Sequence, residues 1–122
     1  MKIKIDYGKN GIYMNLPDHS TVLRPLQSKE LSNPYKAIFD STSNPINSKP
    51  LESLYKKGMI VGVSVCDHTR AQPRNEVIRT IINKFQGILK DDLLIFIATG
   101  SHRQSNVSEI DEMFDEEILS KV

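Results

Sequence analysis

The sequence has no tryptophan, a single cysteine and no excess of either charge. One cysteine excludes an internal disulfide and a zinc cluster made of cysteines, which fits a reducing compartment. Sixteen Lys and Arg residues against fifteen Asp and Glu residues leave a net charge of +1, and the basic residues are spread along the chain. This distribution indicates no nucleic-acid partner and no membrane partner.

Apolar runs long enough to span a bilayer are also missing, and the N-terminus lacks the apolar core of a signal peptide. We therefore expect a cytoplasmic protein. A chain of 122 residues is expected to form a single α/β domain over residues 1–122. This length is at the low end for a complete enzyme with a deep cleft.

Two apolar runs, residues 59–65 and 93–98, each end in a polar loop, residues 66–73 and 99–105. Between them, apolar side chains recur with the spacing of one helix face, at positions 77, 78, 81, 82, 85, 88 and 89. Neither run alternates with polar residues, so both are predicted to be strands buried on both faces. A strand, a helix and a strand in this order predict a right-handed crossover with parallel strands, which is a small Rossmann-like unit.

The N-terminal residues predict a β-hairpin. Polar and apolar residues alternate over residues 2–7, and apolar residues resume over residues 12–16. Asn10 and Gly11 between them tolerate the positive φ of a tight turn. A further short strand is expected at Val22-Leu23.

Three more helices are predicted outside the central unit. One of two or three turns starts at Asn33-Pro34 and ends before a surface loop over residues 40–48. A second covers residues 51–57, with its apolar side chains facing inward. A third runs over residues 106–115 and starts with a capping box. Together these elements predict an α/β fold in which helices pack on a parallel sheet.

Both polar loops leave the same, carboxyl edge of such a sheet, where ligands bind in open α/β folds. The side chains expected around one crevice there are Asp67, His68, Arg70, His102 and Arg103. Each loop runs into a helix, so two helix N-termini are expected to point at the crevice. Together with the planar forks of Arg70 and Arg103, they predict an anion site for a carboxylate or a phosphate.

His102 is the candidate proton carrier of this crevice, because an imidazole exchanges its proton near neutral pH. Asp67 is a candidate to orient a ring nitrogen or a cofactor hydroxyl. We interpret His19 and Cys66 as structural, whereas His68 stays open between a structural and a functional role. The three histidines lack the spacing of metal ligands, so no metal site is expected in this chain.

The two loop motifs resemble those of a known family. Asp67-His-Thr-Arg70 followed by Pro73, and Ala98-Thr-Gly-Ser-His-Arg103, are similar to the paired motifs in the N-terminal domain of the nickel-dependent lactate racemase family. Weaker similarity at Tyr7-Gly8 and over residues 44–51 extends the resemblance over nearly the whole chain. The chain departs from the family at Ala71, where proline is common, and over residues 104–106, which replace a run containing proline.

The resemblance implies a racemase or epimerase of 2-hydroxy acids, in which a histidine removes the hydroxyl proton while hydride passes to a nickel-pincer pyridinium mononucleotide. His102 matches one of the two acid/base histidines, and Arg70 matches an arginine that positions substrate and cofactor. The residues expected to face the cofactor are Asp67, Thr69, Gly100 and Arg103. The family's cofactor-tethering lysine, nickel ligand and second histidine belong to later sequence. This chain is therefore expected to be the N-terminal part of a longer enzyme, with half a site and no tightly bound cofactor of its own.

The expected partners are a small 2-hydroxy acid or another small anion, and the remainder of the parent enzyme. The alternative is a stand-alone anion- or nucleotide-binding α/β module without redox chemistry, which would need only the crevice. A purely structural interaction domain fits less well, because polar, arginine-containing loops at a sheet edge are poor packing material. A longer reading frame with a lysine and two further histidines would favour the enzyme over the module.

Overall fold

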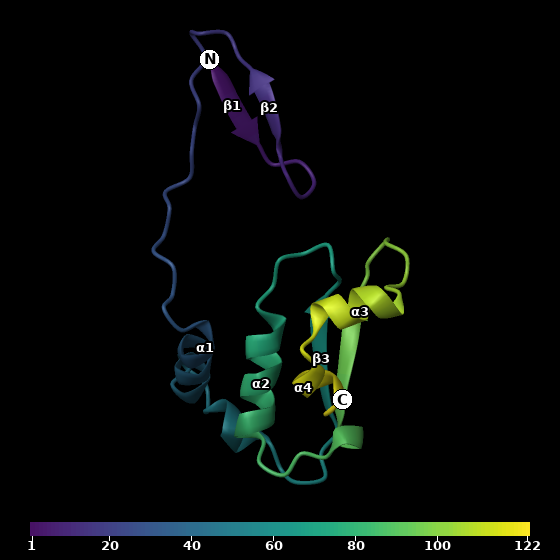
Figure 1. The fold of residues 1–122 in the computed structure, drawn as a ribbon. Helices are drawn as coiled ribbons and strands as arrows, with labels where there is room; N and C mark the ends of the chain where they lie inside the picture. The colour runs from purple at the N-terminus through teal and green to yellow at the C-terminus, as the bar shows by residue number, and fades with distance from the viewer. The chain divides into compact units, whose positions relative to one another are not determined.

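The computed structural model describes all residues from Met1 to Val122, and these form two compact units, Met1–Glu30 and Leu31–Val122 (Figure 1). None of the helices combines the length and the apolar character that crossing a membrane requires. The expectation that residues 1–122 act as one domain stays a prediction.

The first unit contains the predicted hairpin. Strand β1 (Lys2–Ile5) pairs antiparallel with strand β2 (Ile12–Asn15). The turn between them closes with a hydrogen bond of 2.9 Å from the Gly11 N–H to the Tyr7 carbonyl. Gly11 has a φ of 68°, and a Cβ there would lie 2.8 Å from the Ile5 carbonyl oxygen, so this turn requires glycine.

The second unit is built on two parallel strands joined by a helix. Strand β3 (Val61–Cys66) pairs with strand β4 (Leu93–Ala98), and helix α2 (Arg74–Lys84) connects them, as the apolar spacing predicted. The predicted α/β class, a hairpin followed by a parallel strand–helix–strand unit, is thereby confirmed. The remaining elements are α1 (Pro34–Ser43), the 3₁₀ turns η1 (Leu51–Leu54) and η2 (Lys90–Asp92), α3 (Val107–Met113) and α4 (Glu116–Leu119).

One apolar core lies between a face of this sheet and the helices. Its buried members come from β3, α2, β4 and the C-terminal helices, and they are Val65, Ile78, Leu93, Met113, Phe114 and Ile118. Ile118 is only 1% exposed, so the last helix docks on this unit. Burial of a side chain of this size stabilises the fold by roughly 1.5–3 kcal/mol.

The prediction that both strands are buried on both faces is wrong. Exposure alternates along β4, where Leu93 is 2% exposed, Leu94 44% and Phe96 57%. Helices α2, α3 and α4 pack on one face only, and the second unit supplies no layer for the other. The ring of Phe96 lies over Gly62 instead, where a Cβ would come within 2.9 Å of it.

Two local predictions in the first half are also wrong. Residues 22–23 form no strand, and Leu23 is 91% exposed because this stretch pairs with no other strand. Helix α1 continues to Ser43, past the loop start predicted at residue 40. The hydroxyl groups of residues 41–43 donate to carbonyl oxygens one turn back. These side chains are therefore satisfied within the helix and do not end it.

Two helical predictions, one before strand β3 and one after it, are too long. The helix expected over residues 51–57 is the four-residue turn η1, and Leu54 is 53% exposed because the chain becomes extended at Tyr55. Helix α2 ends at Lys84, so Leu89 at the end of its predicted apolar face is 61% exposed.

Candidate functional site

The loops that follow β3 and β4 enclose a cavity of about 250 Å³ at the carboxyl ends of the two strands. Its lining consists of Cys66, Asp67 and Arg70 from the first loop and Ala98, Thr99, Gly100, Ser101 and His102 from the second strand end and its loop. Parallel pairing of β3 and β4 in register brings these two loops to one edge. Four of the predicted site residues, Asp67, Arg70, Gly100 and His102, therefore share one cavity.

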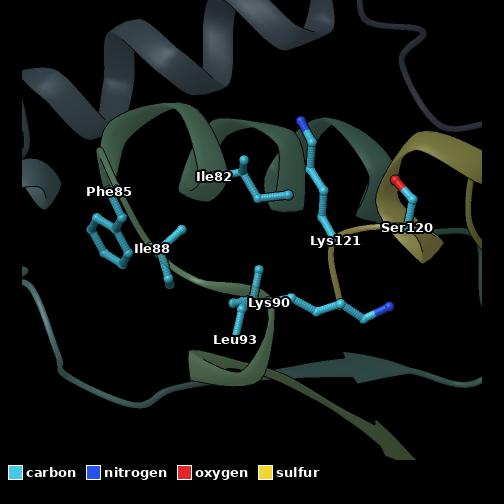
Figure 2. Close-up of a pocket in the computed structure, with 8 residues that line it drawn as sticks. Ile82, Phe85, Ile88, Lys90, Leu93, Ser120 and Lys121 are labelled. Atoms are coloured by element: carbon cyan, nitrogen blue, oxygen red, sulfur yellow. The ribbon is translucent and has the colours of Figure 1, made fainter.

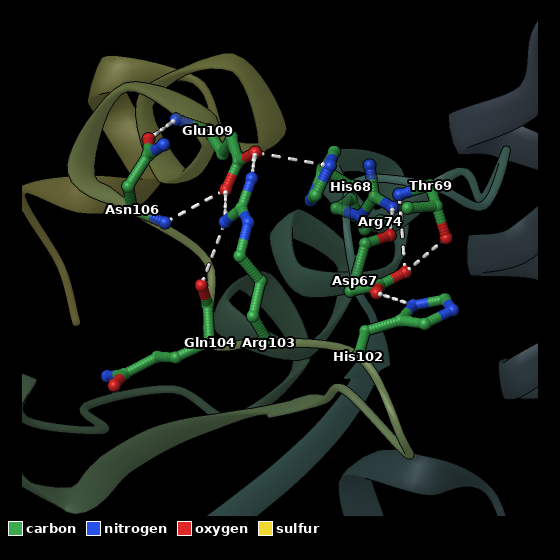
Figure 3. Close-up of polar contacts among 9 residues, drawn as sticks. All are labelled: Asp67, His68, Thr69, Arg74, His102, Arg103, Gln104, Asn106 and Glu109. Atoms are coloured by element: carbon green, nitrogen blue, oxygen red, sulfur yellow. Dashed lines mark hydrogen bonds and ion pairs between the residues drawn. The ribbon is translucent and has the colours of Figure 1, made fainter.

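The central contact of this cavity is between Asp67 and His102 (Figure 3). His102 Nδ1 lies 2.6 Å from Asp67 Oδ2. The other carboxylate oxygen, Oδ1, accepts hydrogen bonds from the Thr69 hydroxyl at 2.6 Å and from the Thr69 N–H at 3.2 Å. Asp67 is 3% exposed, whereas the His102 side chain is half exposed.

These contacts keep Asp67 ionised. The Thr69 hydroxyl and then His102 lower the pKa of Asp67 to about 2, against the opposing effect of burial. An ionised carboxylate can only accept, so the His102 ring must present a proton at Nδ1. The second ring nitrogen, Nε2, then stays available to exchange a proton in the cavity.

Arg70 is the cation of the cavity. Its guanidinium is exposed and makes no hydrogen bond or ion pair within the chain, while its backbone N–H donates to the Asp67 carbonyl at 3.3 Å. A planar guanidinium without a partner matches the carboxylate of a small acid, or a phosphate oxygen pair.

The sequence predicted that Arg103 lies beside Arg70 at the cavity. In the structure Arg103 is not part of the cavity lining. Its guanidinium binds the Glu109 carboxylate with two contacts, of 2.9 Å and 2.6 Å (Figure 3). His68 Nε2 lies 3.3 Å from the same carboxylate. Arg103 is the main cause that lowers the pKa of Glu109 to about 2. The competing acid, six residues further along the chain, is the reason that Arg103 turns away from the cavity.

The two helix N-termini also lie outside the cavity lining. Helix α3 begins with the predicted capping box: the Asn106 side chain accepts from the Glu109 N–H, and the Glu109 carboxylate accepts from the Asn106 N–H, both at 2.9 Å. This box satisfies two of the free N–H groups that an anion would need. Helix α2 begins at Arg74, whose side chain folds back over the preceding loop.

Gly100 forms the turn that presents His102. Its φ of 58° places it in the left-handed region, and the His102 N–H donates to the Thr99 carbonyl at 3.0 Å. A Cβ on Gly100 would meet no atom within 4 Å, so the space beside this turn is open. Thr69 is not part of the cavity lining and acts on the site through Asp67.

Two residues that the sequence patterns did not single out hold the first loop. Gln72 Oε1 accepts from the Cys66 N–H at 2.9 Å, and Arg74 Nη2 donates to the carbonyls of Asp67 and Arg70. The signal in the sequence was a pair of long polar side chains at the exit of the motif loop. In the sequence alone, Gln72 and Arg74 look the same as solvent-exposed residues.

A second cavity of about 290 Å³ lies at the amino-terminal end of β4 (Figure 2). Apolar side chains of α2 and the residues after it line most of it, and Lys90 and Lys121 stand at its edge. Lys121 is already paired with Glu117 at 3.1 Å. No acid, histidine or arginine side chain lines this cavity, so none of the site residues predicted from the sequence belongs to it. In the whole chain, no group of three His, Cys, Asp or Glu side chains is placed to hold a metal ion.

Comparison with known proteins agrees with the motifs at this cavity. Residues 7–122 match the family described as the lactate racemase N-terminal domain. The lactate racemase of Thermoanaerobacterium thermosaccharolyticum is 29% identical over 125 residues, covering 96% of this chain and 29% of that protein. The lactate racemase of Lactiplantibacillus plantarum is 30% identical over 86 residues, covering 70% of this chain and 20% of that protein. The chain thus spans less than a third of either relative, and it belongs to the lactate racemase N-terminal domain family.

Proposed function

We propose that this chain is the N-terminal part of a racemase or epimerase of 2-hydroxy acids and carries half of its active site. Membership of the lactate racemase N-terminal domain family supports the reaction class. The family match covers residues of both compact units, which supports the proposal that they work as one domain. The remainder of the parent enzyme would complete the site, since both relatives extend well beyond the matched region.

The observation that carries this proposal is the Asp67–His102 pair beside the free guanidinium of Arg70. Arg70 would bind the substrate carboxylate with its planar fork. His102 would take the hydroxyl proton at Nε2 while the hydrogen on C2 leaves as hydride, for which the cofactor would be the acceptor. The ionised Asp67 would stabilise the imidazolium formed, because it already faces Nδ1 at 2.6 Å. When hydride returns to the opposite face of C2, Arg70 would still hold the carboxylate of the keto acid while its oxygen takes up a proton.

The residues of this chain fit the anionic part of a mononucleotide cofactor. The open turn at Gly100 leaves room for a close approach of the cofactor. Arg103 would bind a phosphate by giving up its ion pair with Glu109. The loss of this ion pair costs little free energy, because the Arg103 side chain is 64% exposed. Asp67, held by Thr69, would face a hydroxyl group of the cofactor and not its phosphate, because two anions repel each other. A nickel-pincer pyridinium cofactor, when bound, supplies the carbon that accepts hydride, and the soft donors to its metal would not come from these side chains.

The test is carried out on the full-length parent protein, isolated with its cofactor. Replacement His102→Ala should cut the interconversion of D- and L-lactate by roughly 10²-fold or more, the usual scale for a general acid/base. His19→Ala is the matched control, because His19 lies outside the cavity lining and should leave the rate unchanged. A folded, loaded His102→Ala enzyme with close to the normal rate would refute the role of His102. A parent protein that binds lactate or phosphate and never interconverts the enantiomers would establish the binding-module alternative instead.

A further inference from the structure

We infer that Arg74 is a positioning residue: its guanidinium holds the carbonyl groups of the first motif loop, and thereby fixes Asp67 against His102 and Arg70 at the cavity. The inference rests on the proposed function for the meaning of the His102 contact. The positioning itself is a property of the chain without substrate.

The contacts of Arg74 converge on one short stretch of backbone, of which Figure 3 shows the contact with Asp67. Its Nη2 donates to the Arg70 carbonyl at 2.8 Å and to the Asp67 carbonyl at 2.9 Å, with the Cys66 carbonyl at 3.5 Å. From the same end of the loop, Gln72 Oε1 accepts from the Cys66 N–H at 2.9 Å. The side chains at the end of the loop therefore bind both the N–H and the carbonyl groups at its start. Hydrogen bonds from a charged donor are about twice as strong as neutral ones.

The location of Arg74 argues against a general stabilising role for its charge. Arg74 is the first residue of α2, where the helix dipole disfavours a cation. Its Nε is buried and has no hydrogen-bond partner, which adds a desolvation cost. No acidic side chain pairs with it. The contacts that offset these costs all go to the carbonyl groups of the loop, so the loop is what this side chain organises.

The restraint reaches the reacting group in two steps. Arg74 fixes the backbone at Asp67, and the Asp67 carboxylate, buried at 3% exposure, then has one direction in which to meet His102 Nδ1. Arg74 also fixes the backbone at Arg70, from which the free guanidinium leaves toward the cavity. Without Arg74, the carbonyl groups of residues 66, 67 and 70 lose their common donor. The loop would then turn toward water, and both side chains would move with it.

The experiment uses the full 122-residue chain and two NMR readouts of the site. Carbon-detected titration follows the Asp67 carboxyl, and nitrogen shifts of the His102 ring report which nitrogen carries the proton. Arg74→Met should raise the pKa of Asp67 from about 2 toward the ordinary 3.8 and remove the preference for a proton on Nδ1. In Arg74→Lys the ammonium group can still donate to some of the three carbonyl groups. Its Asp67 pKa and its preference for a proton on Nδ1 should therefore be intermediate.

The matched control is Arg79→Met on the same helix. Arg79 pairs with Asp115 at 2.7 Å and with Glu117 at 3.4 Å, so its loss should lower stability and leave both readouts unchanged. A folded Arg74→Met chain with native Asp67 titration and native His102 shifts refutes the inference. Should Arg74→Met not fold, native values in Arg74→Lys refute it equally. Failure of the proposed catalysis would appear only in the racemisation assay, so the two ideas fail separately.

Discussion

Replacement of Asp67 by asparagine should change which nitrogen of His102 carries the proton. Thr69 donates to Oδ1 with its backbone N–H at 3.2 Å and with its hydroxyl at 2.6 Å. A backbone N–H can only donate, so the amide oxygen of Asn must occupy the Oδ1 position. The amide NH₂ then faces His102 Nδ1, which has to accept. The ring is thereby driven to carry its proton on Nε2.

The size of the effect on the rate follows from the role that we propose for Nε2 of His102. A ring protonated on Nε2 cannot take the hydroxyl proton there, so Asp67→Asn removes most of the general-base contribution. That contribution is roughly 10²- to 10⁴-fold in rate, and the loss should fall in this range. Because asparagine has nearly the size and shape of aspartate, packing and substrate binding should change far less than the rate constant kcat.

Two measurements check this prediction. Nitrogen NMR of the Asp67→Asn chain should show the proton moved from Nδ1 to Nε2, and the full-length Asp67→Asn enzyme should lose turnover at a nearly constant KM. Glu109→Gln is the matched control, since it makes the same change in the neighbouring cluster and leaves the Asp67–His102 contact in place. A variant that keeps Nδ1 protonated, or that racemises within a few-fold of the normal rate, refutes the reasoning.

Three further predictions follow from the site. Arg70→Lys keeps the charge but loses the planar fork, so in the parent enzyme KM should rise and kcat should fall together. Glu109 and Asp67 have pKa values lowered to about 2 from 4.5 and 3.8, so their stabilising contribution is complete above the ordinary values and is lost as the pH falls toward 2. The temperature of thermal unfolding should therefore fall as the pH is lowered, and this fall should be smaller in Glu109→Gln. After dialysis against nickel, the isolated chain should retain no stoichiometric metal by elemental analysis, because its histidines form no ligand cluster.

Local patterns were sufficient to predict the central fold and insufficient to predict what covers it. Helical spacing between two apolar runs predicted α2 between β3 and β4. A helix of this length returns the chain to the end of the sheet where β3 starts, which makes the two strands parallel. An unbroken apolar run, however, does not show whether a second layer is present. Leu94 and Phe96 are apolar and exposed for that reason. Likewise, Ser and Thr at the end of α1 read as loop residues because side-chain bonds to the preceding turn leave no mark in the sequence.

The candidate site could be predicted at the level of loops, and less well at the level of side-chain partners. Two motifs at the ends of parallel strands place Asp67, Arg70 and His102 together, whatever their rotamers. The direction of a long side chain depends on rival partners nearby. Arg103 was expected at the cavity and binds Glu109 instead, whereas Arg74, which no sequence pattern singled out, binds the loop. Such choices among partners are decided by distances that only the folded chain fixes.

The same choices set the electrostatics of the cavity. Arg103 and Glu109 neutralise each other outside it, and the charge of Asp67 is turned toward Thr69 and His102. Of the ionised side chains that line the cavity, only Arg70 lacks an internal partner. The charges of Asp67 and Arg70 balance at the cavity, but only the Arg70 guanidinium is left free for an anionic ligand. A single planar cation beside a proton acceptor suits an acid with one carboxylate and an adjacent hydroxyl group, because the carboxylate takes the fork and leaves the hydroxyl facing the imidazole.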